Sequence, residues 1–398
     1  MNSGNVAALI RGLLIDITGK PQFVITGEAG TVSDSDGVMV LELNHDEAVE
    51  SAAVKIRAAY EAWKKAAPHV PSCVVLKLDG KHAATFWTDN DFDSARKRLQ
   101  EKNASSRTGK KPVTNAKVKT EDRASVVKNK IALVTGGAQG IGEEIVRNLA
   151  AAGALVFIAD MNMEGAIKLA EDINTEEGRN AAIALEVNVS REDSVYEMIN
   201  SIAVTSGGLD LCVSNAGVLR AGSVLEQELN DFKFVTDINY TGFFVVSKYA
   251  GRLLKTQHLT APTWKTDIVQ INSKSGLEGS NKNGAYAGGK FGGIGLVASF
   301  AMELVEYNIK VNAICPGNFL DGPLWSHPEK GLFVQYLNTG KVPGAKTLAD
   351  VRAAYEARVP MKRGCTGKDL VRALFYTVEQ EYETGQAVPV TGGQIMLH

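Results

Sequence analysis

The sequence lacks the residue patterns that mark most disulfide-rich and metal-dependent proteins. Its 398 residues contain four cysteines, Cys73, Cys212, Cys315 and Cys365, and no two of them form a C-x-x-C pair. The six histidines show no H-E-x-x-H or similar ligand spacing. These absences argue against a catalytic metal, and reduced cytosolic thiols are the simplest account of the cysteines.

Long apolar runs and a strong charge imbalance are also absent. No apolar run approaches 20 residues and no basic-then-apolar leader is visible, so the sequence predicts neither a membrane span nor a signal peptide. The 43 lysines and arginines against 45 aspartates and glutamates give a net charge of −2, which offers nucleic acid no general attraction. We expect a cytoplasmic protein without nucleic-acid or membrane partners. The length favours two or three domains.

A glycine-rich turn lies between a predicted strand and a predicted helix. Residues 130–134 form a short apolar run typical of a buried parallel strand, and residues 143–152 have a helical pattern. The turn between them reads Thr135-Gly136-Gly137-Ala138-Gln139-Gly140-Ile141-Gly142. Glycines in this context allow a tight turn and let the backbone approach a pyrophosphate at the positive end of the helix dipole. The segment therefore predicts a dinucleotide-binding loop.

Asp160 ends a second predicted strand, over residues 154–159, and stands eighteen residues after Gly142. A carboxylate at this place can accept hydrogen bonds from an adenosine ribose. The alternative is an N-cap aspartate for the helix that follows.

Charge at this strand end favours NAD over NADP. The extra phosphate of NADP would lie beside Asp160, and neither Met161-Asn162 nor Ala138-Gln139 supplies a cation to offset the repulsion. An arginine brought from elsewhere in the fold stays open as an alternative.

Three polar residues further along have a spacing typical of alcohol oxidation. Ser273 stands thirteen residues before Tyr286, and Lys290 stands four residues after it. Lys290 therefore shares a helix face with Tyr286, while Ser273 follows a predicted strand over residues 267–271, whose carboxyl end is a ligand-binding edge in open α/β sheets. A nearby ammonium and a nicotinamide cation both favour the ionised form of a phenol, whose ordinary pKa is about 10. Each residue alone could be an ordinary packing or surface residue, but together they predict proton exchange coupled to hydride transfer.

These motifs resemble those of the short-chain dehydrogenase/reductase family. The loop of residues 135–142 matches its T-G-x-x-x-G-x-G pattern, Ser214-Asn215-Ala216-Gly217 matches its N-A-G turn, and Cys315-Pro316-Gly317 matches its P-G turn. Asn239 stands where the family has an active-site asparagine, whereas Asn188 replaces an aspartate usual near the adenine. The likeness covers residues from about 127 to 398. It implies a Rossmann-type doubly wound parallel sheet of the α/β class and a homo-oligomer, commonly a tetramer built on the helix of Tyr286.

The resemblance also implies roles for individual residues. Tyr286 would accept the alcohol proton, Lys290 would lower its pKa and hold the nicotinamide ribose, Ser273 would bind the reacting oxygen, and Asn239 would support a water relay. The expected NAD contacts are Gly136, Gln139, Gly140, Ile141, Gly142, Asp160, Asn188, Val189, Asn215, Ala216, Gly217, Tyr286, Lys290, Pro316 and Gly317.

A narrower likeness concerns the substrate. Residues 268–276, 290–293, 359–365 and 390–394 resemble the sorbitol-6-phosphate 2-dehydrogenases of that family, which implies oxidation of sorbitol 6-phosphate to fructose 6-phosphate. A substrate phosphate needs a cation, for which Lys274 is the first candidate, with Arg363 and Lys362 as others. Lys362 is equally explained as a solvated surface residue. The expected substrate contacts are Ser273, Lys274, Tyr286, Asn318 and Arg363, and residues 318–360 are expected to form a lobe over the substrate.

The first hundred residues contain no recognisable catalytic set. Residues 1–102 are predicted to form a small α+β accessory domain, followed by a basic linker over residues 103–126. Helices are expected from a capping box at Asn44 and Glu47 to Ala66, and from Asp91 to Lys102. Strands are expected over Gly12–Thr18, Gln22–Thr26, Gly37–Leu43, Ser72–Asp79 and His82–Thr88, with Asp79-Gly80 as a hairpin turn.

Two other functions stay open. The same catalytic tetrad of Asn239, Ser273, Tyr286 and Lys290 could oxidise a different polyol or hydroxy-sugar. The chain could also be an NAD-sensing protein whose N-terminal domain recruits a partner, although a sensor does not need Ser273 and Tyr286 in register.

Overall fold

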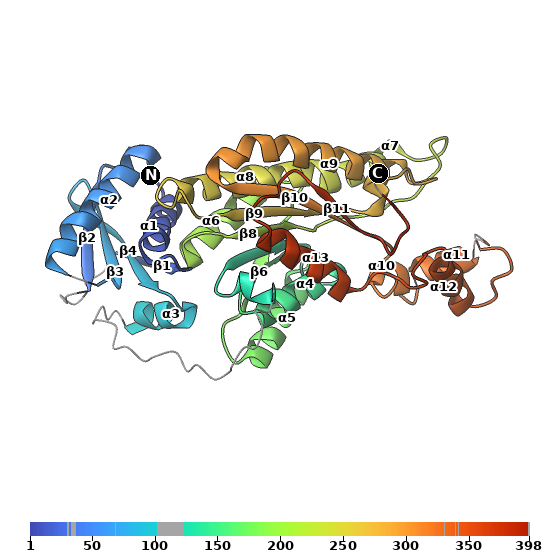
Figure 1. Cartoon of the computed structure of the whole chain (residues 1–398), viewed down its shortest axis with the longest axis horizontal. Coiled ribbons are helices and arrows are strands. Elements are labelled where there is room, and N and C mark those ends of the chain that lie inside the picture. Colours follow the sequence, from blue (N-terminus) through green and yellow to red (C-terminus); the bar gives the residue numbers. More distant parts are fainter. Residues whose placement is uncertain are drawn as a thin grey trace.

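The computed structural model describes residues 1–29, 32, 37–67, 69–101, 123–329, 331–338, 340 and 342–396. Two sheets organise them, a seven-stranded sheet in the larger part of the chain and a four-stranded sheet near the N-terminus. The two lie beside each other in Figure 1, and a helical lobe extends from the end of the larger part that is farthest from the small sheet.

The large sheet is parallel throughout and has the strand order β11-β10-β9-β8-β5-β6-β7. Its strands are β5 (Ile131–Thr135), β6 (Leu155–Asp160), β7 (Ala182–Glu186), β8 (Leu211–Ser214), β9 (Thr266–Ile271), β10 (Ile309–Pro316) and β11 (Ala387–Val390). The winding direction reverses between β5 and β8, and such a switch point opens a crevice at the carboxyl ends of the strands. The predicted doubly wound α/β sheet is confirmed.

Helices cover both faces of this sheet (Figure 1). One face carries α4 (Gly140–Ala151), α5 (Met163–Glu177) and α13 (Gly367–Glu379), and the other carries α6 (Glu192–Ser206), α8 (Gly242–His258) and α9 (Gly284–Leu304). A short helix, α7 (Leu229–Thr236), leads through the π-helical turn η2 (Asp237–Thr241) into α8, and single 3-10 turns form η3 (Lys274–Gly276) and η4 (Val305–Tyr307). None of the helices in the described part of the chain has both the length and the apolar composition that a membrane crossing requires.

The N-terminal unit has a mixed sheet of order β1-β4-β3-β2, in which β2 runs parallel to β3. Its elements are α1 (Ser3–Thr18), β1 (Phe23–Glu28), β2 (Val38–Leu43), α2 (Val49–Ala66), β3 (Cys73–Leu78), β4 (Lys81–Asp89) and α3 (Phe92–Glu101). Asp79 and Gly80 have φ of 49° and 77°, as a two-residue hairpin turn requires. Asn44 and Glu47 bond to each other in a turn before α2, which begins only at Val49.

The predicted strand over Gly12–Thr18 is wrong, because these residues form the second half of α1. Local β-branched residues favoured a strand, but the helix is fixed at both ends by an Asn2 cap and a left-handed Gly19. Gly12 is needed for close packing rather than for breaking the helix: a Cβ there would lie 2.3 Å from Thr260 Oγ1 and 2.5 Å from the Gln257 carbonyl oxygen at the end of α8.

The N-terminal unit has a core of its own between its sheet, α1 and α2, and it also shares a second apolar cluster with the large unit. Ala8 of α1 and apolar residues of β1 and α3 belong to this shared cluster, together with residues of β5, α6 and α8. Between the two units, the fully buried Arg11 donates through Nη2 to Asp210 Oδ2 at 2.7 Å and through Nε to the Gln22 carbonyl at 2.7 Å. Asp210 also accepts from Ile131 N at 2.8 Å and Trp264 Nε1 at 2.9 Å.

The predicted linker over residues 103–126 lies mostly outside the described residues. The chain is described again from η1 (Arg123–Val127), which packs against α13. Arg123 Nε lies 2.6 Å from Glu379 Oε2.

The lobe consists of α10 (Pro323–Ser326), α11 (Leu332–Asn338) and α12 (Leu348–Ala357). It has a core of its own, in which the Trp325 ring lies 4.8 Å from Tyr355 and 5.3 Å from Phe333, measured between ring centroids. A small aromatic core of this kind lets the lobe keep a fixed shape beside the sheet.

Candidate active site

The glycine loop closes tightly after β5. Gly136 and Gly140 have φ of 61° and 60°, in the left-handed region that favours glycine. A Cβ on Gly142 would lie 2.0 Å from the carbonyl oxygen of Gly136, so only glycine fits there. Gln139, the N-cap of α4, makes no side-chain cap hydrogen bond. The first N–H groups of α4 are therefore left for an anionic ligand.

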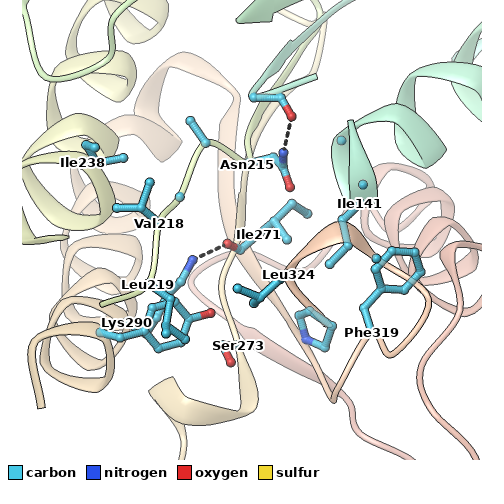
Figure 2. A pocket seen from close by; sticks show the side chains of 18 of the residues that line it. Ile141, Asn215, Val218, Leu219, Ile238, Ile271, Ser273, Lys290, Phe319 and Leu324 are labelled. Carbon is cyan, nitrogen blue, oxygen red and sulfur yellow. Dashed lines mark hydrogen bonds between the residues drawn. The ribbon is translucent and has the colours of Figure 1, made fainter. Parts of the chain in front are cut away.

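The turn after β8 is tied to this loop. Asn215 donates through Nδ2 to the carbonyl oxygens of Thr135 (3.0 Å) and Gly136 (2.9 Å). Thr135 Oγ1 accepts from the backbone N–H groups of Asn215 (3.0 Å) and Ala216 (3.1 Å). Figure 2 shows Asn215 and Ile141 lining the same pocket. The bonds hold the two strand ends at the switch point in fixed register.

Asp160 lies next to the glycine loop. Its carboxylate accepts from Ala138 N at 3.0 Å and Asn162 N at 2.9 Å. The N-cap of α5 is Asn162, whose side chain accepts from Gly165 N, so the capping alternative for Asp160 is wrong. A carboxylate has about four acceptor positions, which leaves capacity for ribose hydroxyls.

Asn188 lies on the same side of the cleft. Its Oδ1 accepts from the N–H and the hydroxyl of Ser190, at 3.0 and 2.7 Å. The carbonyl end of the amide is therefore occupied, and its NH₂ end is the part that would face an adenine.

The fold brings Ser273, Tyr286 and Lys290 together where β9 meets α9. Lys290 Nζ donates to the Ile271 carbonyl at 2.8 Å and lies 5.6 Å from the centre of the Tyr286 ring. Figure 2 shows the Lys290–Ile271 bond with Ser273 close by. Asn272, which the sequence did not single out, accepts from Ser273 N at 2.8 Å and donates to the Lys290 carbonyl at 2.9 Å. Its side chain thus ties two of the predicted catalytic residues to each other.

Burial controls the acidity of these groups. It raises the pKa of Tyr286, although the Ser273 hydroxyl opposes the change, and it lowers the pKa of Lys290 to about 8. The Lys290 ammonium donates to the Ile271 carbonyl beside the phenol, and a cation brought by a ligand would add a second charge that favours the ionised form of Tyr286.

Lys290→Met should change the pH dependence of stability. The pKa of Lys290 is about 8 in the folded chain and near its ordinary 10.5 in the unfolded one, so wild-type stability rises between those values by up to about 1.4 kcal/mol per pH unit. The melting-temperature difference, variant minus wild type, should therefore fall from pH 7 to pH 10. Lys168→Met on the exposed face of α5 should give a flat difference. A flat difference for Lys290→Met would contradict the prediction.

Asn239 is buried in η2 rather than exposed in the cleft. Its Oδ1 accepts from Val218 N at 2.8 Å, and its Nδ2 donates to the Val218 carbonyl at 2.9 Å. A Cβ on Gly217 would lie 3.4 Å from Asn239 Oδ1 and 3.8 Å from Lys290 Nζ. Asn239 therefore holds the backbone of the N-A-G turn beside the lysine.

These elements enclose one cleft of about 990 Å³ at the carboxyl edge of the sheet. All fifteen predicted cofactor contacts line it, together with Ser273, Lys274 and Asn318. Arg363 does not line it. Its guanidinium binds both carboxylate oxygens of Asp369, at 2.5 and 2.9 Å, beside a separate hollow at the C-terminal strand. The sequence could not show this pairing, because it depends on how the segment folds back onto α13.

Other residues of the cleft wall carry no signal in the sequence alone. The lobe contributes apolar and aromatic side chains, and Figure 2 shows Phe319 across the cleft from Lys290, with Leu324 between them. Residues that sequence reasoning missed include Arg220, Phe234, Asn272, Ser280, Asn283, Phe319, Leu324, Trp325, His327, Tyr336 and Tyr355. Their only signal is position, after strand ends or within the segment expected to cover the substrate.

The residues present fit a dinucleotide. A cradle that only glycine allows, free helix N–H groups and a carboxylate beside them suit a pyrophosphate and a ribose. Among the described residues that line the cleft, Arg220 binds Asp231 (3.6 Å) and the Phe234 ring, while Lys274 and Lys290 lie at the tetrad. No cation of the described wall is therefore assigned to Asp160.

Comparisons with known proteins agree with this geometry. A family model described as short chain dehydrogenase matches residues 130–327. Sorbitol-6-phosphate 2-dehydrogenase of Escherichia coli is 34% identical over 272 residues, which are 68% of this chain and all of that enzyme. Meso-2,3-butanediol dehydrogenase of Serratia marcescens is 30% identical over 255 residues, 61% of this chain and 96% of that enzyme.

A solved structure of the same family also matches this chain. The crystal structure of sorbitol-6-phosphate 2-dehydrogenase from Erwinia amylovora matches with a TM-score of 0.62 and 36% identity, over 67% of this chain and all of that one. About a third of the present chain lies outside this match.

Proposed function

The chain belongs to the short-chain dehydrogenase family, and on this premise we propose that it oxidises sorbitol 6-phosphate to fructose 6-phosphate with NAD. The observation that carries the substrate proposal is Lys274, which lines the cleft directly after Ser273. Within the described chain, no residue forms a hydrogen bond or ion pair with its ammonium. A free cation beside the reacting groups suits a phosphate ester.

Oxidation at C2 removes a proton from the hydroxyl and a hydride from the carbon. The nicotinamide ring, when bound, supplies the hydride acceptor. Ser273 Oγ binds the reacting oxygen, and Tyr286 Oη takes its proton. Lys290, bound to the Ile271 carbonyl, positions its ammonium beside the phenol. Asn239 keeps the N-A-G turn in place through both of its bonds to Val218.

NAD should be preferred to NADP. The Asp160 carboxylate would repel a 2′-phosphate and bind ribose hydroxyls. Asp160→Ala removes both effects, so the ratio of kcat/KM for NAD to that for NADP should fall at least tenfold. Steady-state kinetics with both cofactors measures the ratio, and Asp193→Ala on the exposed start of α6 should leave it unchanged. A wild-type enzyme that uses NADP better would refute the proposal.

A panel of polyols and polyol phosphates tests the substrate. A charge-assisted contact to phosphate is worth about 1.5 to 3 kcal/mol, or roughly ten- to hundredfold in affinity. Lys274→Ala should therefore weaken sorbitol 6-phosphate by that factor and free sorbitol much less, as NADH formation would show. Lys233→Ala, on the exposed face of α7, is the matched control. Equal use of sorbitol and its phosphate ester by the wild type would contradict the substrate and leave the dehydrogenase intact.

A second candidate is the oxidation of another polyol or hydroxy-sugar. The apolar wall formed by Phe319, Leu324 and Trp325 favours it, because such a wall suits a substrate less polar than a hexitol phosphate. The relative that is named for meso-2,3-butanediol points the same way. The panel separates the two, and NAD binding without turnover of any member would instead favour an NAD sensor.

We also propose the assembly and organisation of the chain. Exposed aromatic residues on three neighbouring helices, Phe232, Phe244 and Phe291, support a homo-oligomer, a tetramer or a dimer. Residues 1–102 would be an accessory domain, 103–126 a linker, and 127–398 the dehydrogenase. We propose a cytoplasmic location, and the four free cysteine thiols support it because the cytoplasm keeps thiols reduced.

A further inference from the structure

Asn283 carries a buried polar atom without a partner. The residue is 9% exposed and lines the cleft, and its Oδ1 accepts no hydrogen bond from any of the described residues. Native proteins leave few buried acceptors unpaired, because each costs the free energy of its lost hydration. An unpaired acceptor in the wall of a cleft indicates a group that a ligand completes.

The local backbone explains why the protein does not complete it. Asn283 is the N-cap of α9, where an asparagine ordinarily accepts from an N–H of the first turn, but no such bond forms. Asn162 and Thr366, by contrast, cap α5 and α13 in the usual way. An isolated bridge to Gly222 fixes the backbone of Asn283, and its carbonyl accepts from Ala287 N at 2.9 Å. The amide is thus held at the cleft wall and does not cap its own helix.

The surroundings of Asn283 indicate the chemistry of that ligand. Tyr286 follows one turn along α9, and Ser273, Lys274 and Ser280 line the same cleft. The lobe supplies apolar side chains, of which Figure 2 shows Phe319 on the side away from Lys290 and Leu324 between them. A polyol has this two-sided character, since its hydroxyls can bind polar groups while its C–H groups pack on apolar ones.

We propose that Asn283 Oδ1 accepts a hydrogen bond from a substrate hydroxyl other than the one that is oxidised, and so selects polyols over simple alcohols. The proposal rests on the dehydrogenase function proposed above. A hydroxyl can donate to this oxygen, whereas a methylene or a C–F group cannot. An analogue without the hydroxyl leaves the acceptor buried and unpaired, and a site of this kind rejects such analogues strongly. Asn283 is a specificity-determining residue in this scheme, and the proton transfer stays with Tyr286.

Deoxy substrates combined with one substitution test the proposal. The probes are sorbitol 6-phosphate and its 1-deoxy and 3-deoxy analogues. Each analogue lacks the hydroxyl on one of the two carbons next to the reacting C2. Wild-type enzyme should lose about ten- to hundredfold in kcat/KM with one of the analogues. Asn283→Leu, which has a similar volume and no acceptor, should use that analogue and the parent compound equally well. The loss for the parent should appear mainly in KM, because a hydroxyl away from the reacting carbon contributes binding.

A matched variant and a binding measurement separate this from misfolding. Asn281→Leu makes the same change two residues earlier, at an exposed position outside the cleft, and should keep the wild-type discrimination. Calorimetry should give Asn283→Leu an unchanged affinity for NAD. If Asn283→Leu still discriminates between parent and analogue as the wild type does, or loses equally with all three compounds, the inference is overturned and the dehydrogenase proposal stands. If the wild type oxidises none of the polyol phosphates, both proposals fail.

Discussion

Tyr286→Phe should lower turnover by a factor on the order of 100 or more while leaving NAD binding nearly unchanged. The substitution removes the single oxygen that can take the alcohol proton and keeps the ring that packs beside Lys290. Ser273 is a poor replacement, because a serine hydroxyl is a much weaker acid than a phenol and is therefore not ionised at neutral pH. The measurement is NADH formation under saturating substrate, with calorimetry for NAD affinity.

The control for this variant is Tyr196→Phe on the exposed side of α6. Both variants lose one phenolic oxygen, but Tyr196 lies outside the cleft and should keep full activity. Near-normal turnover by Tyr286→Phe would refute the assignment of the proton acceptor, whatever the substrate proves to be.

Arg11→Met should destabilise the folded chain by about 3 to 5 kcal/mol. The substitution leaves the fully buried Asp210 carboxylate without its guanidinium partner, while methionine fills much of the same volume. Burial alone would raise the pKa of Asp210, and Arg11 and Lys130 together hold it below its usual range. Urea denaturation at pH 7 should show the loss as a lower midpoint in the variant.

The pH dependence of that loss identifies its cause. A carboxyl whose pKa is depressed by folding stabilises the protein above its ordinary pKa and loses that contribution as the pH falls. The difference in unfolding free energy between wild type and Arg11→Met should therefore narrow as the pH falls below 3.8, the ordinary pKa of an aspartate. Arg57→Met is the control, because Arg57 joins the half-exposed Asp16 and should cost about 1 kcal/mol or less. If the stability difference between wild type and Arg11→Met did not change with pH, the destabilisation would come from lost packing alone.

The sequence predicts which residues gather around the glycine loop, because that part of the cleft depends on local rules. A glycine with positive φ, a helix that begins at Gly140 and a strand that ends at Asp160 are each encoded within a few residues. The switch point then brings separate strand ends together without further information. Ser273, Tyr286 and Lys290 meet for the same reason, since η3, which follows β9, packs against α9.

Long-range packing explains the errors. Residues 12–18 of α1 have a local preference for strand, which the packing of the helix against α6 and α8 overrides. Arg363 has the right charge for a phosphate, but the capping box of α13 places Asp369 against it. Asn283 was not singled out because only the fold shows that its amide lacks a partner. Charge and secondary-structure propensity are visible in a sequence. Tertiary structure decides which group each side chain contacts.

Contacts between the two units can form only late in protein synthesis, because their two partners lie far apart in the sequence. Thr260 Oγ1 donates to the carbonyl of Leu9, which lies 251 residues earlier in the sequence. Arg11 and its partner Asp210 are 199 residues apart. At about 5 to 20 residues per second, a ribosome needs roughly 10 to 50 s to supply the second member of the first pair. For that time the face of α1 that packs on α6 and α8 lacks its partners, while its residues in the N-terminal cluster already have theirs.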